Sequence, residues 1–433
     1  MRKLLAVLLA ALMLLSFPAI AEEQVTITIG LPYNTEPSDA EGPDMWFDII
    51  SLYEATYPNY NVEVICQGEN SDDQNAALQM AAAANNLPDL TYGSFGYVDD
   101  WSNVGLLLNL EDYLDEEFFA QFAAGAVDYT NAFNQNEGVY GLPCRAETQG
   151  WLYNTALFEQ VGLEIPTTWN EFMNAVKVFR ENGITPISHG ATDIWAIWGY
   201  HAMFNNYGLT LEMAQQLQNR EIKFADNETF VKTFTRIAEL AEAGAYPEDV
   251  ATTSNDVAMA RFAAGEAAMY GIYDGIATQT FEGYKATGES DIVDHCVFNF
   301  GPKFEDGVED FCGLRTYGWT LMPAASLADD PARCEAVMAF LKLFFSAEGT
   351  AIVQNYQVPA TDFEMQHPEG ESMLHASMFE SYVADIVPVP DNNQAYFDQS
   401  IKPTYRNAIT GLICGTLTVE DALSMMQDWA DTM

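Results

Sequence analysis

The sequence contains few basic residues for its length. Lysine and arginine together number 17 among 433 residues, against 63 aspartates and glutamates, so the formal net charge is −46. A surface of this charge repels phosphate backbones and anionic lipid headgroups, which argues against nucleic acid and anionic membranes as partners. The chain is not an acidic disordered tail, because 49% of its residues are hydrophobic and can form a core.

The sequence also lacks the motifs of most catalytic and metal sites. Its five histidines form no H-E-x-x-H pair, and it contains no G-x-S-x-G, P-loop or dinucleotide-binding pattern. Its six cysteines show no C-x-x-C spacing, which gives little support for zinc. They could form disulfides in an exported protein or remain buried thiols. We therefore expect no cofactor and no metal site.

Only one long apolar run is present, and it lies at the start of the chain. Residues 4–17 follow two basic residues and precede the small-residue sequence Ala-Ile-Ala at 19–21. This pattern is typical of a secretory signal peptide, residues 1–21, cleaved after Ala21. A transmembrane anchor is the alternative, although fourteen residues are short for a span of about 20. No cysteine for lipid attachment stands at the cleavage site, so we expect an exported protein, in the periplasm or outside the cell, soluble after cleavage.

The rest of the chain alternates strand patterns with helix patterns. Residues 25–31 alternate apolar and polar side chains, as a half-buried strand does. The order strand, helix, strand, helix, strand up to residue 92 indicates an α/β fold with a mostly parallel sheet. The chain is too long for one hydrophobic core, so two lobes are expected. Further predicted elements are a helix from about 44 to 57, strands at 62–66 and 88–92, a helix at 73–84, an extended run ending at 151–154, a helix with a Thr168–Glu171 capping box, a helix at 332–345 that starts with Asp330-Pro331, and a helix that opens at Thr418 with Asp421 three residues on.

Six local patterns, in order along nearly the whole mature chain, resemble one family. The most specific is Gly-Leu at 162–163 followed by Pro-Thr-Thr-Trp-Asn-Glu-Phe at 166–172. With these patterns the chain resembles the extracellular solute-binding proteins of ABC importers, in the large group related to maltose-binding protein. The patterns lie at 57–64, 87–90 with 105–110, 138–143 with 151–172, 262–269, 317–319 and 415–423.

This resemblance implies an α/β fold of two lobes, the class II type of periplasmic binding protein, with a ligand cleft between the lobes. It also implies a hinge that the chain crosses three times, which we place near Gly141, Cys296 and Phe345. The expected N-terminal lobe is 22–141 plus 296–345, and the expected C-terminal lobe is 142–295 plus 346–433. The implied function is to bind a small-molecule ligand, a sugar or oligosaccharide, by lobe closure and to present it to the membrane permease subunits of an importer. We expect a monomer.

Candidate ligand-binding residues are chosen in loops at the carboxyl ends of predicted strands, because such loops line the cleft of an α/β lobe. A sugar needs aromatic rings for its apolar faces and amide or charged groups for its hydroxyls. For any single aromatic residue, packing in the core is the alternative. The candidates are Tyr33, Asn34, Ser94, Phe95, Asp193, Trp195, Trp198, Arg315, Tyr317 and Trp319.

Further candidates rest on the resemblance. Glu147 lies seven residues before the asparagine of a Tyr-Asn pair, where maltose-binding protein has a sugar-contacting glutamate; a solvated carboxylate is the alternative. Phe397 and Asp398 align with an aromatic sugar-binding stretch of the family. The family commonly has a tryptophan six residues after an Ala-Met pair, and this chain has glycine there. Tyr273 and Asp274 could take its place.

Arg145 and Arg315 stand out in a chain with few basic residues. Either could clamp the carboxylate or phosphate of an anionic ligand, such as an acidic sugar or a glycerol phosphodiester. A structural pair with a neighbouring acid is the alternative. The identity of the ligand therefore stays open between sugars and other small solutes.

A secreted carbohydrate-active enzyme is the alternative class. A glycosidase needs two carboxylates about 5–5.5 Å or about 6.5–9.5 Å apart, and a chain with 63 acidic residues can supply such a pair. A surface or adhesion protein is a third class and would have no closing cleft. The family patterns and the missing catalytic motifs favour a binding protein, so we expect no catalytic residue and no enzyme activity.

Overall fold

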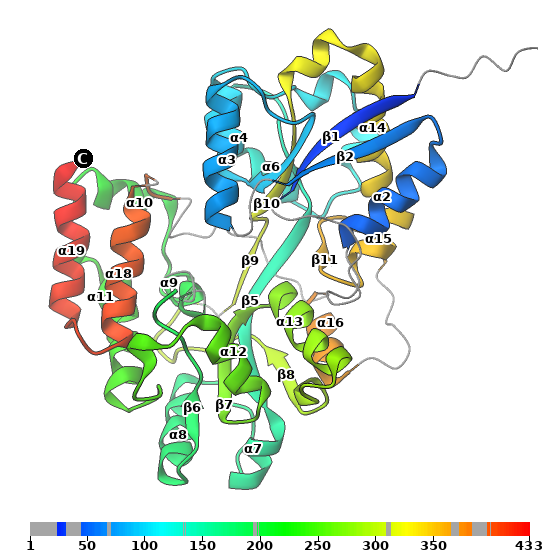
Figure 1. Cartoon of the computed structure of the whole chain (residues 1–433). Helices are drawn as coiled ribbons and strands as arrows, with labels where there is room; N and C mark the ends of the chain where they lie inside the picture. The colour runs from blue at the N-terminus through cyan, green and yellow to red at the C-terminus, as the bar shows by residue number, and fades with distance from the viewer. Residues whose placement is uncertain are drawn as a thin grey trace, which may run out of the picture.

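A computed structural model of the chain describes residues 24–31, 45–66, 71–132, 134, 136–193, 197, 199–308, 313–364, 372–382, 396–398 and 400–433. These residues form two sheets with helices packed around them, which gives the two lobes seen at the top and the bottom of Figure 1. The predicted signal peptide lies outside the described residues.

The first sheet has the strand order β2-β1-β3-β10-β4. Strands β1, β2 and β3 are parallel, and β10 runs antiparallel to both of its neighbours. The strand predicted at 25–31 is confirmed with the same bounds. The third strand starts two residues later than predicted, because the Asp89 carboxylate accepts hydrogen bonds from the Thr28 main chain and hydroxyl. The bounds are β1 Val25–Leu31, β2 Tyr60–Cys66, β3 Leu90–Ser94, β4 Leu142–Pro143 and β10 Trp319–Pro323.

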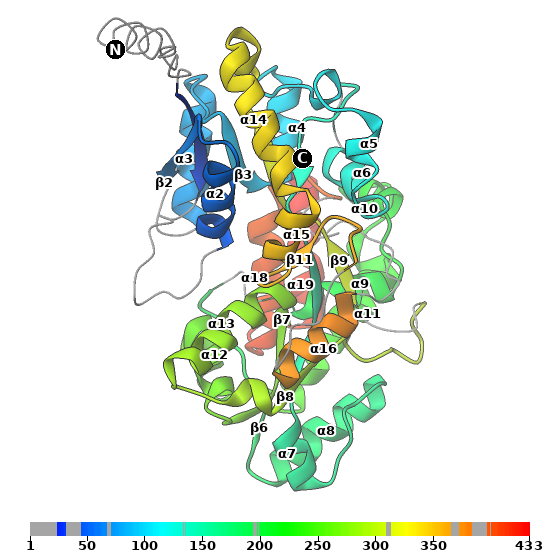
Figure 2. The same cartoon turned by 90° about the vertical axis from the view of Figure 1, so that its right-hand side faces the viewer.

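Helices α2 and α14 pack on this sheet, and α15 packs on both of these helices. Figure 2 shows α14 running along the first lobe beside α15. Helix α14 begins at Pro331, and the Asp330 side chain accepts from the main-chain N–H of Arg333, so the predicted start is confirmed. Asp44, the predicted cap of α2, lies outside the described residues. The elements of this lobe are α2 Met45–Thr56, α3 Ser71–Ala83, α4 Gly96–Asn103, η1 Leu110–Asp112, α5 Glu116–Phe119, α6 Ala126–Asn131, η6 Ala325–Asp329, α14 Pro331–Phe344 and α15 Ala347–Val353.

The second sheet is built around one long strand, β5. Strands β7, β8, β9 and β11 all pair with β5 in antiparallel fashion, and β6 pairs with β7 in parallel. Figure 1 shows β5 running down from the upper lobe through the lower one. The bounds are β5 Arg145–Asn154, β6 Thr185–Ile187, β7 Ala267–Tyr273, β8 Cys296–Asn299, β9 Leu314–Thr316 and β11 Val358–Pro359.

Two helices of the second lobe begin with caps that the sequence predicts. Both capping boxes, Thr168–Glu171 and Thr418–Asp421, are present. The elements are α7 Thr155–Val161, α8 Trp169–Glu181, α9 His201–Asn206, α10 Leu211–Gln218, η3 Phe224–Asp226, α11 Glu228–Glu242, η4 Val250–Thr252, α12 Asn255–Ala263, α13 Asp274–Thr287, η5 Ile292–Asp294, α16 Met373–Tyr382, α18 Ile401–Ile413 and α19 Val419–Thr432.

The chain passes between the two sheets later than expected, above all at the second and third passages. The first passage is at Cys144, between β4 and β5, close to the expected Gly141. Strands β8 and β9 pair with β5, so the return to the first sheet lies between 316 and 319 and not at Cys296. Helix α15 still packs on α2, and β11 pairs with β5, so the third passage lies between 353 and 358 and not at Phe345. Strand-forming patterns do not encode which sheet a strand joins, and this is why the boundaries shift.

The passages are embedded in a hydrophobic core that both lobes share. This core contains Ile29 and Leu321 of the first sheet together with Leu152 and Ile272 of the second. A second core fills the opposite side of the second sheet, around aromatic residues such as Phe172. Side chains on the crossing strands are therefore held by both lobes.

Among the described helices, none is both long and apolar enough to cross a membrane alone; α14 and α15, bent by 65° at their junction, pass that test only as a pair.

Candidate ligand-binding site

The passages between the sheets bring together residues that lie far apart in the sequence. Strand β10 pairs with β3 so that Trp319 lies opposite Ser94. Strand β9 pairs with β5 so that Thr316 lies opposite Glu147. Six predicted ligand residues therefore lie on or next to the strands that meet here: Ser94, Phe95, Glu147, Arg315, Tyr317 and Trp319. These six residues, together with Tyr92, Tyr129 and Arg145, are called the crossing cluster.

An ion pair between Arg145 and Glu147 is the charged part of the crossing cluster. The two residues are two apart on β5, so their side chains project from the same face of the strand. Arg145 Nη2 donates to Glu147 Oε1 at 2.8 Å, and the two side chains are only 12% and 13% exposed. Gly318 leaves room for this carboxylate, because a Cβ at position 318 would lie 2.8 Å from Glu147 Oε2. A charge-assisted hydrogen bond is strong in such a shielded place.

Trp319 lies between an aromatic ring and this guanidinium. The Tyr92 ring stacks on it, with centroids 4.8 Å apart and ring planes at 14°. The guanidinium carbon of Arg145 lies 5.6 Å from the Trp319 ring centroid, within cation–π range. Strand β10 lies between β3, which carries Tyr92, and β4, which Arg145 closely follows, so the two neighbours flank Trp319 on opposite sides. Trp319 is thus a fixed wall of the crossing cluster, with protein against both faces of its ring.

Arg315 joins the crossing cluster to helix α16. Its side chain is buried, with Nε donating to Thr148 Oγ1 at 3.3 Å and Nη2 donating to the carbonyl of Ser381 on α16. Arg145 is paired with Glu147. Both arginines therefore have partners inside the protein, and the Arg145 partner is an acid, as the structural-pair alternative predicts. The partners of Arg315 named above are a hydroxyl and a carbonyl oxygen.

Aromatic rings from the first lobe complete the crossing cluster. Tyr129 of α6 lies between Phe95 and Tyr317, with centroid distances of 5.4 and 5.6 Å. Burial raises the pKa of Tyr317, and Asp362 adds to the rise while Arg315 opposes it. The phenol therefore stays neutral near pH 7 and can donate as well as accept a hydrogen bond. Phe95 is half-buried, and its main-chain N–H donates to the carbonyl of Gly318 at 3.0 Å.

The family profile of bacterial extracellular solute-binding proteins matches residues 36–351. The chain belongs to this family. The resemblance seen in the sequence patterns is confirmed by this match. The matched residues include the passage at Cys144 and the passage at 316–319, where the crossing cluster lies.

Named relatives of this solute-binding protein match shorter stretches. The multiple sugar-binding protein of Streptococcus mutans is 26% identical over 159 residues, which is 36% of this chain and 35% of that protein. A probable sugar-binding periplasmic protein of Rhizobium meliloti is 27% identical over 125 residues, 28% of this chain and 30% of that protein. The matched stretches thus span about a third of the length of these relatives.

Solved structures similar to this solute-binding protein share its fold over almost the whole chain. A structure from work on xylan utilization by Caldanaerobius polysaccharolyticus has a TM-score of 0.76 and 22% identity, covering 94% of this chain and 100% of that one. A chitin oligosaccharide binding protein has a TM-score of 0.75 and 21% identity, covering 94% and 98%. RafE in complex with raffinose has a TM-score of 0.71 and 18% identity, covering 94% and 99%. At these identities the similarity establishes the two-lobed α/β fold, as predicted.

Asp193 and Tyr273 lie elsewhere in the second lobe of this solute-binding protein. The Asp193 carboxylate accepts a 2.5 Å hydrogen bond from the main-chain N–H of Asn255, at the start of α12. Tyr273 ends β7 opposite Gln149 of β5 and is buried. Asp193 therefore fastens a loop to a helix, whereas Tyr273 lies beside the strand that carries Glu147.

Phe397 and Asp398 lie in the second lobe, outside the crossing cluster. Phe397 is buried among Phe224, Phe230 and Trp429, so the core alternative applies to it. The Asp398 carboxylate accepts from the Ser400 side chain and main-chain N–H, which lowers the pKa of Asp398. The structure thus does not bring these two residues into the crossing cluster.

Several predicted residues cannot be placed. Tyr33, Asn34, Trp195 and Trp198 lie outside the described residues, as does the side chain of Asp274. Their ligand-binding roles stay predictions.

Sequence reasoning missed two aromatic members of the crossing cluster. Tyr92 is two residues before Ser94 on β3 and so shares its face of the sheet, a period-two signal that was available. Tyr129 sits on the short helix α6, and nothing local distinguishes it from a core tyrosine.

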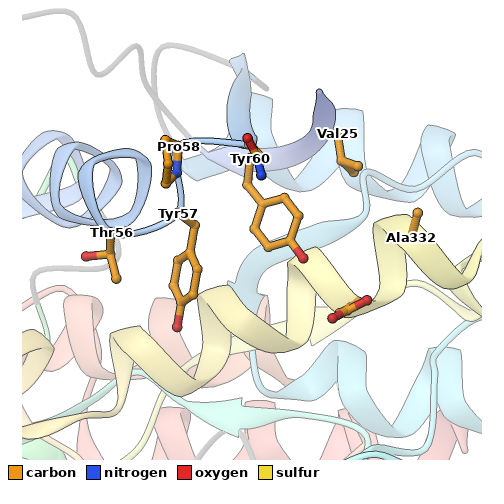
Figure 3. Close-up of a pocket in the computed structure, with 8 residues that line it drawn as sticks. Val25, Thr56, Tyr57, Pro58, Tyr60 and Ala332 are labelled. Atoms are coloured by element: carbon orange, nitrogen blue, oxygen red, sulfur yellow. The ribbon is translucent and has the colours of Figure 1, made fainter. Parts of the chain in front are cut away.

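Two hollows in the described part of the surface are lined by residues other than the predicted ligand residues. One, of about 400 Å³, is lined by the end of α2, the start of β1 and β2 and the start of α14, and Figure 3 shows Tyr57 and Tyr60 pointing toward α14. The other, of about 610 Å³, lies between β8 and α16. Neither is lined by a residue of the crossing cluster.

Proposed function

We propose that this protein is the extracytoplasmic substrate-binding subunit of an ABC importer and that its ligand is a sugar or oligosaccharide. The observation that carries the proposal is the crossing cluster, in which the ion pair of Glu147 and Arg145 on β5 meets aromatic rings of the first lobe at the passages. The names of the relatives support the same ligand class, since they include sugar-binding proteins. The signal peptide at 1–21 and delivery to membrane permease subunits belong to the proposal.

The chemistry of the crossing cluster suits hydroxyl-rich ligands. The Glu147 carboxylate can accept hydrogen bonds from neighbouring hydroxyls, and the neutral Tyr317 phenol can donate or accept. The half-buried Phe95 ring offers an apolar surface for the C–H face of a sugar ring. A ligand that contacts these groups touches both lobes, so it binds the closed arrangement better and shifts the population toward it.

The proposal assigns no bond chemistry to the protein. A glycosidase needs one protonated and one ionised carboxylate facing each other. Glu147 instead forms an ion pair with Arg145, an arrangement that favours the ionised carboxylate and gives no proton donor. We therefore infer that the ligand is bound and released unchanged. That the protein acts as a monomer is a separate part of the proposal.

A thermal-shift screen of the mature chain, residues 22–433, tests the proposal. The panel contains mono- and oligosaccharides, with uronic acids, glycerol phosphodiesters and amino acids as controls. A saccharide at 100 times its dissociation constant should stabilise the fold by about 2.7 kcal/mol, a shift of several degrees at most for a chain of this size. The Glu147→Ala variant should lose most of that shift. A response to a saccharide recovered intact supports the proposal, whereas cleavage products or a response confined to the controls would overturn it.

A further inference from the structure

The charge at the crossing cluster is unlike the charge of the whole molecule. The chain carries a net charge of −46, yet a basic residue, Arg145, lies beside the Glu147 carboxylate here. The guanidinium of Arg145 donates a hydrogen bond to this carboxylate. Arg145 therefore offsets the charge of Glu147 locally.

Arg145 offsets the charge of Glu147 at a shielded place. Its guanidinium sits against the Trp319 ring and bonds to Glu147, and its side chain is only 12% exposed. A carboxylate beside the face of an indole is the arrangement that binds quaternary ammonium and other organic cations. In this protein the place of such a cation is taken by a side chain of the same strand.

We propose that Arg145 is a specificity-determining residue that excludes cationic solutes from the ligand site. It fills the cation position between Trp319 and Glu147 and cancels the charge of that carboxylate. A solute with hydroxyl groups can still share the carboxylate, whereas a solute ammonium would face the guanidinium at close range. This inference rests on the proposed function in one respect, that ligands bind at the crossing cluster.

The charge of the whole molecule makes such a device useful. A strongly negative surface attracts cations and raises their local concentration at any opening. Without an internal counter-charge, an exported protein with such an acidic surface and an aromatic and acidic ligand site would attract polyamines and quaternary amines. Arg145 removes the local attraction while the surface charge stays as it is.

Calorimetric titration with choline tests the inference directly. Removal of the guanidinium in Arg145→Ala leaves a space between Trp319 and Glu147, and choline should bind this variant on the order of tenfold tighter than it binds the wild type. Arg261→Ala is the matched control, because Arg261 forms an exposed pair with Asp249 and its loss changes the net charge equally. The control should bind choline no better than the wild type.

Two more variants separate the local effect from a general one. Arg145→Lys keeps the charge and should behave like the wild type toward choline. Arg145→Ala with Glu147→Gln should lose the gain, because the carboxylate that holds the cation is gone. Equal choline affinity in wild type and Arg145→Ala, or an equal gain in Arg261→Ala, would overturn the inference.

A reciprocal experiment covers the case in which Arg145→Ala does not fold. Glu147→Gln leaves the guanidinium unbalanced, so glucuronate should bind this variant on the order of tenfold tighter than the wild type. Asp249→Asn is the matched surface control. No gain for glucuronate would contradict the inference. If the saccharide screen fails but these charge effects are observed, only the sugar assignment is wrong. If a saccharide binds but these charge effects are not observed, only the inference about Arg145 is wrong.

Discussion

Gly318 and Glu147 face each other across a narrow space at the second passage. A Cβ at position 318 would lie 2.8 Å from Glu147 Oε2, too close for an ordinary contact. Because the atom it meets is the end of a flexible side chain, the carboxylate would move and the fold would tolerate the change. Gly318→Ala is therefore expected to displace the group that we assign to the ligand.

We predict that Gly318→Ala lowers saccharide affinity on the order of tenfold, because a displaced carboxylate loses a charged hydrogen bond to the ligand. Thermal unfolding should change little. Gly283→Ala is the control, since nothing lies within 4 Å of a Cβ added there, in α13. Wild-type affinity in Gly318→Ala, measured by titration calorimetry, would argue against Glu147 as a ligand residue.

His189 links the stability of the second lobe to pH. It is buried beside the rings of Tyr200 and Tyr246, at centroid distances of 5.7 and 5.8 Å. Burial lowers the pKa of His189 to about 4, below its usual value of about 6.5. Between these two pH values the unfolded chain binds a proton that the folded chain does not, so the free energy of unfolding falls as the pH drops from about 6.5 to about 4.

We predict that His189→Gln makes the acid destabilisation shallower, by roughly 2–3 kcal/mol over that window. Urea unfolding of wild type and variant at pH 7 and pH 4.5 gives the comparison. The carboxylates titrate in both proteins and cancel in the difference. An equal loss of stability in the two proteins would mean that His189 is not buried as a neutral group.

Residue types that serve two purposes limited the prediction of the site. Trp319 was expected from the sequence, but its contact with Tyr92 and Arg145 depends on the strand order. Phe397 is an aromatic residue of the kind that can stack on a sugar ring, but it is buried in the core. Arg315 could be selected because the chain has few basic residues. Glu147 could be selected because the family patterns point to its position.

At the scale of helices and strands, local chemistry predicted well and long-range pairing did not. The caps Asp330, Thr168 and Thr418 and the pattern at 25–31 depend on neighbours within a few residues, and the structure has them as predicted. The return of the chain to the first sheet depends on whether β8 and β9 pair with β5, and nothing within those strands encodes this choice. The hinge boundaries were therefore displaced although the helices that flank them were placed well.

Asp89 illustrates how one residue joins several elements. It ends the turn before β3, is 1% exposed, and accepts hydrogen bonds from the Thr28 N–H at 2.8 Å and the Thr28 hydroxyl at 3.0 Å. It also forms an ion pair with Arg333 of α14. The carboxylate thus ties β1, β3 and α14 together.

We predict that Asp89→Ala destabilises the fold by about 3 kcal/mol, because a buried carboxylate with several partners is lost and those partners stay in place. Asp249→Ala, which breaks the exposed pair with Arg261, should cost less than about 1 kcal/mol. Urea unfolding of both variants provides the test. Equal small losses would mean that the Asp89 junction contributes no more than a surface pair.

At the scale of the whole molecule, the shared core constrains how the lobes can move. Buried apolar contacts continue from the first sheet through β5 into the second sheet. Closure must therefore come from small rotations at the passages near 144, 316–319 and 353–358, with each sheet kept intact. The crossing cluster lies at two of these passages, so a ligand held there acts on the hinge itself.

Small-angle X-ray scattering of the mature chain, with and without a saturating saccharide found in the thermal screen, tests the central claim most directly. If the ligand binds between the lobes and closes them, the radius of gyration falls while the mass stays that of a monomer, and the fall is lost in Glu147→Ala at the same saccharide concentration. An unchanged radius of gyration at saturation would contradict ligand-driven closure at the crossing cluster. An equal fall in Glu147→Ala at the same saccharide concentration would contradict it as well.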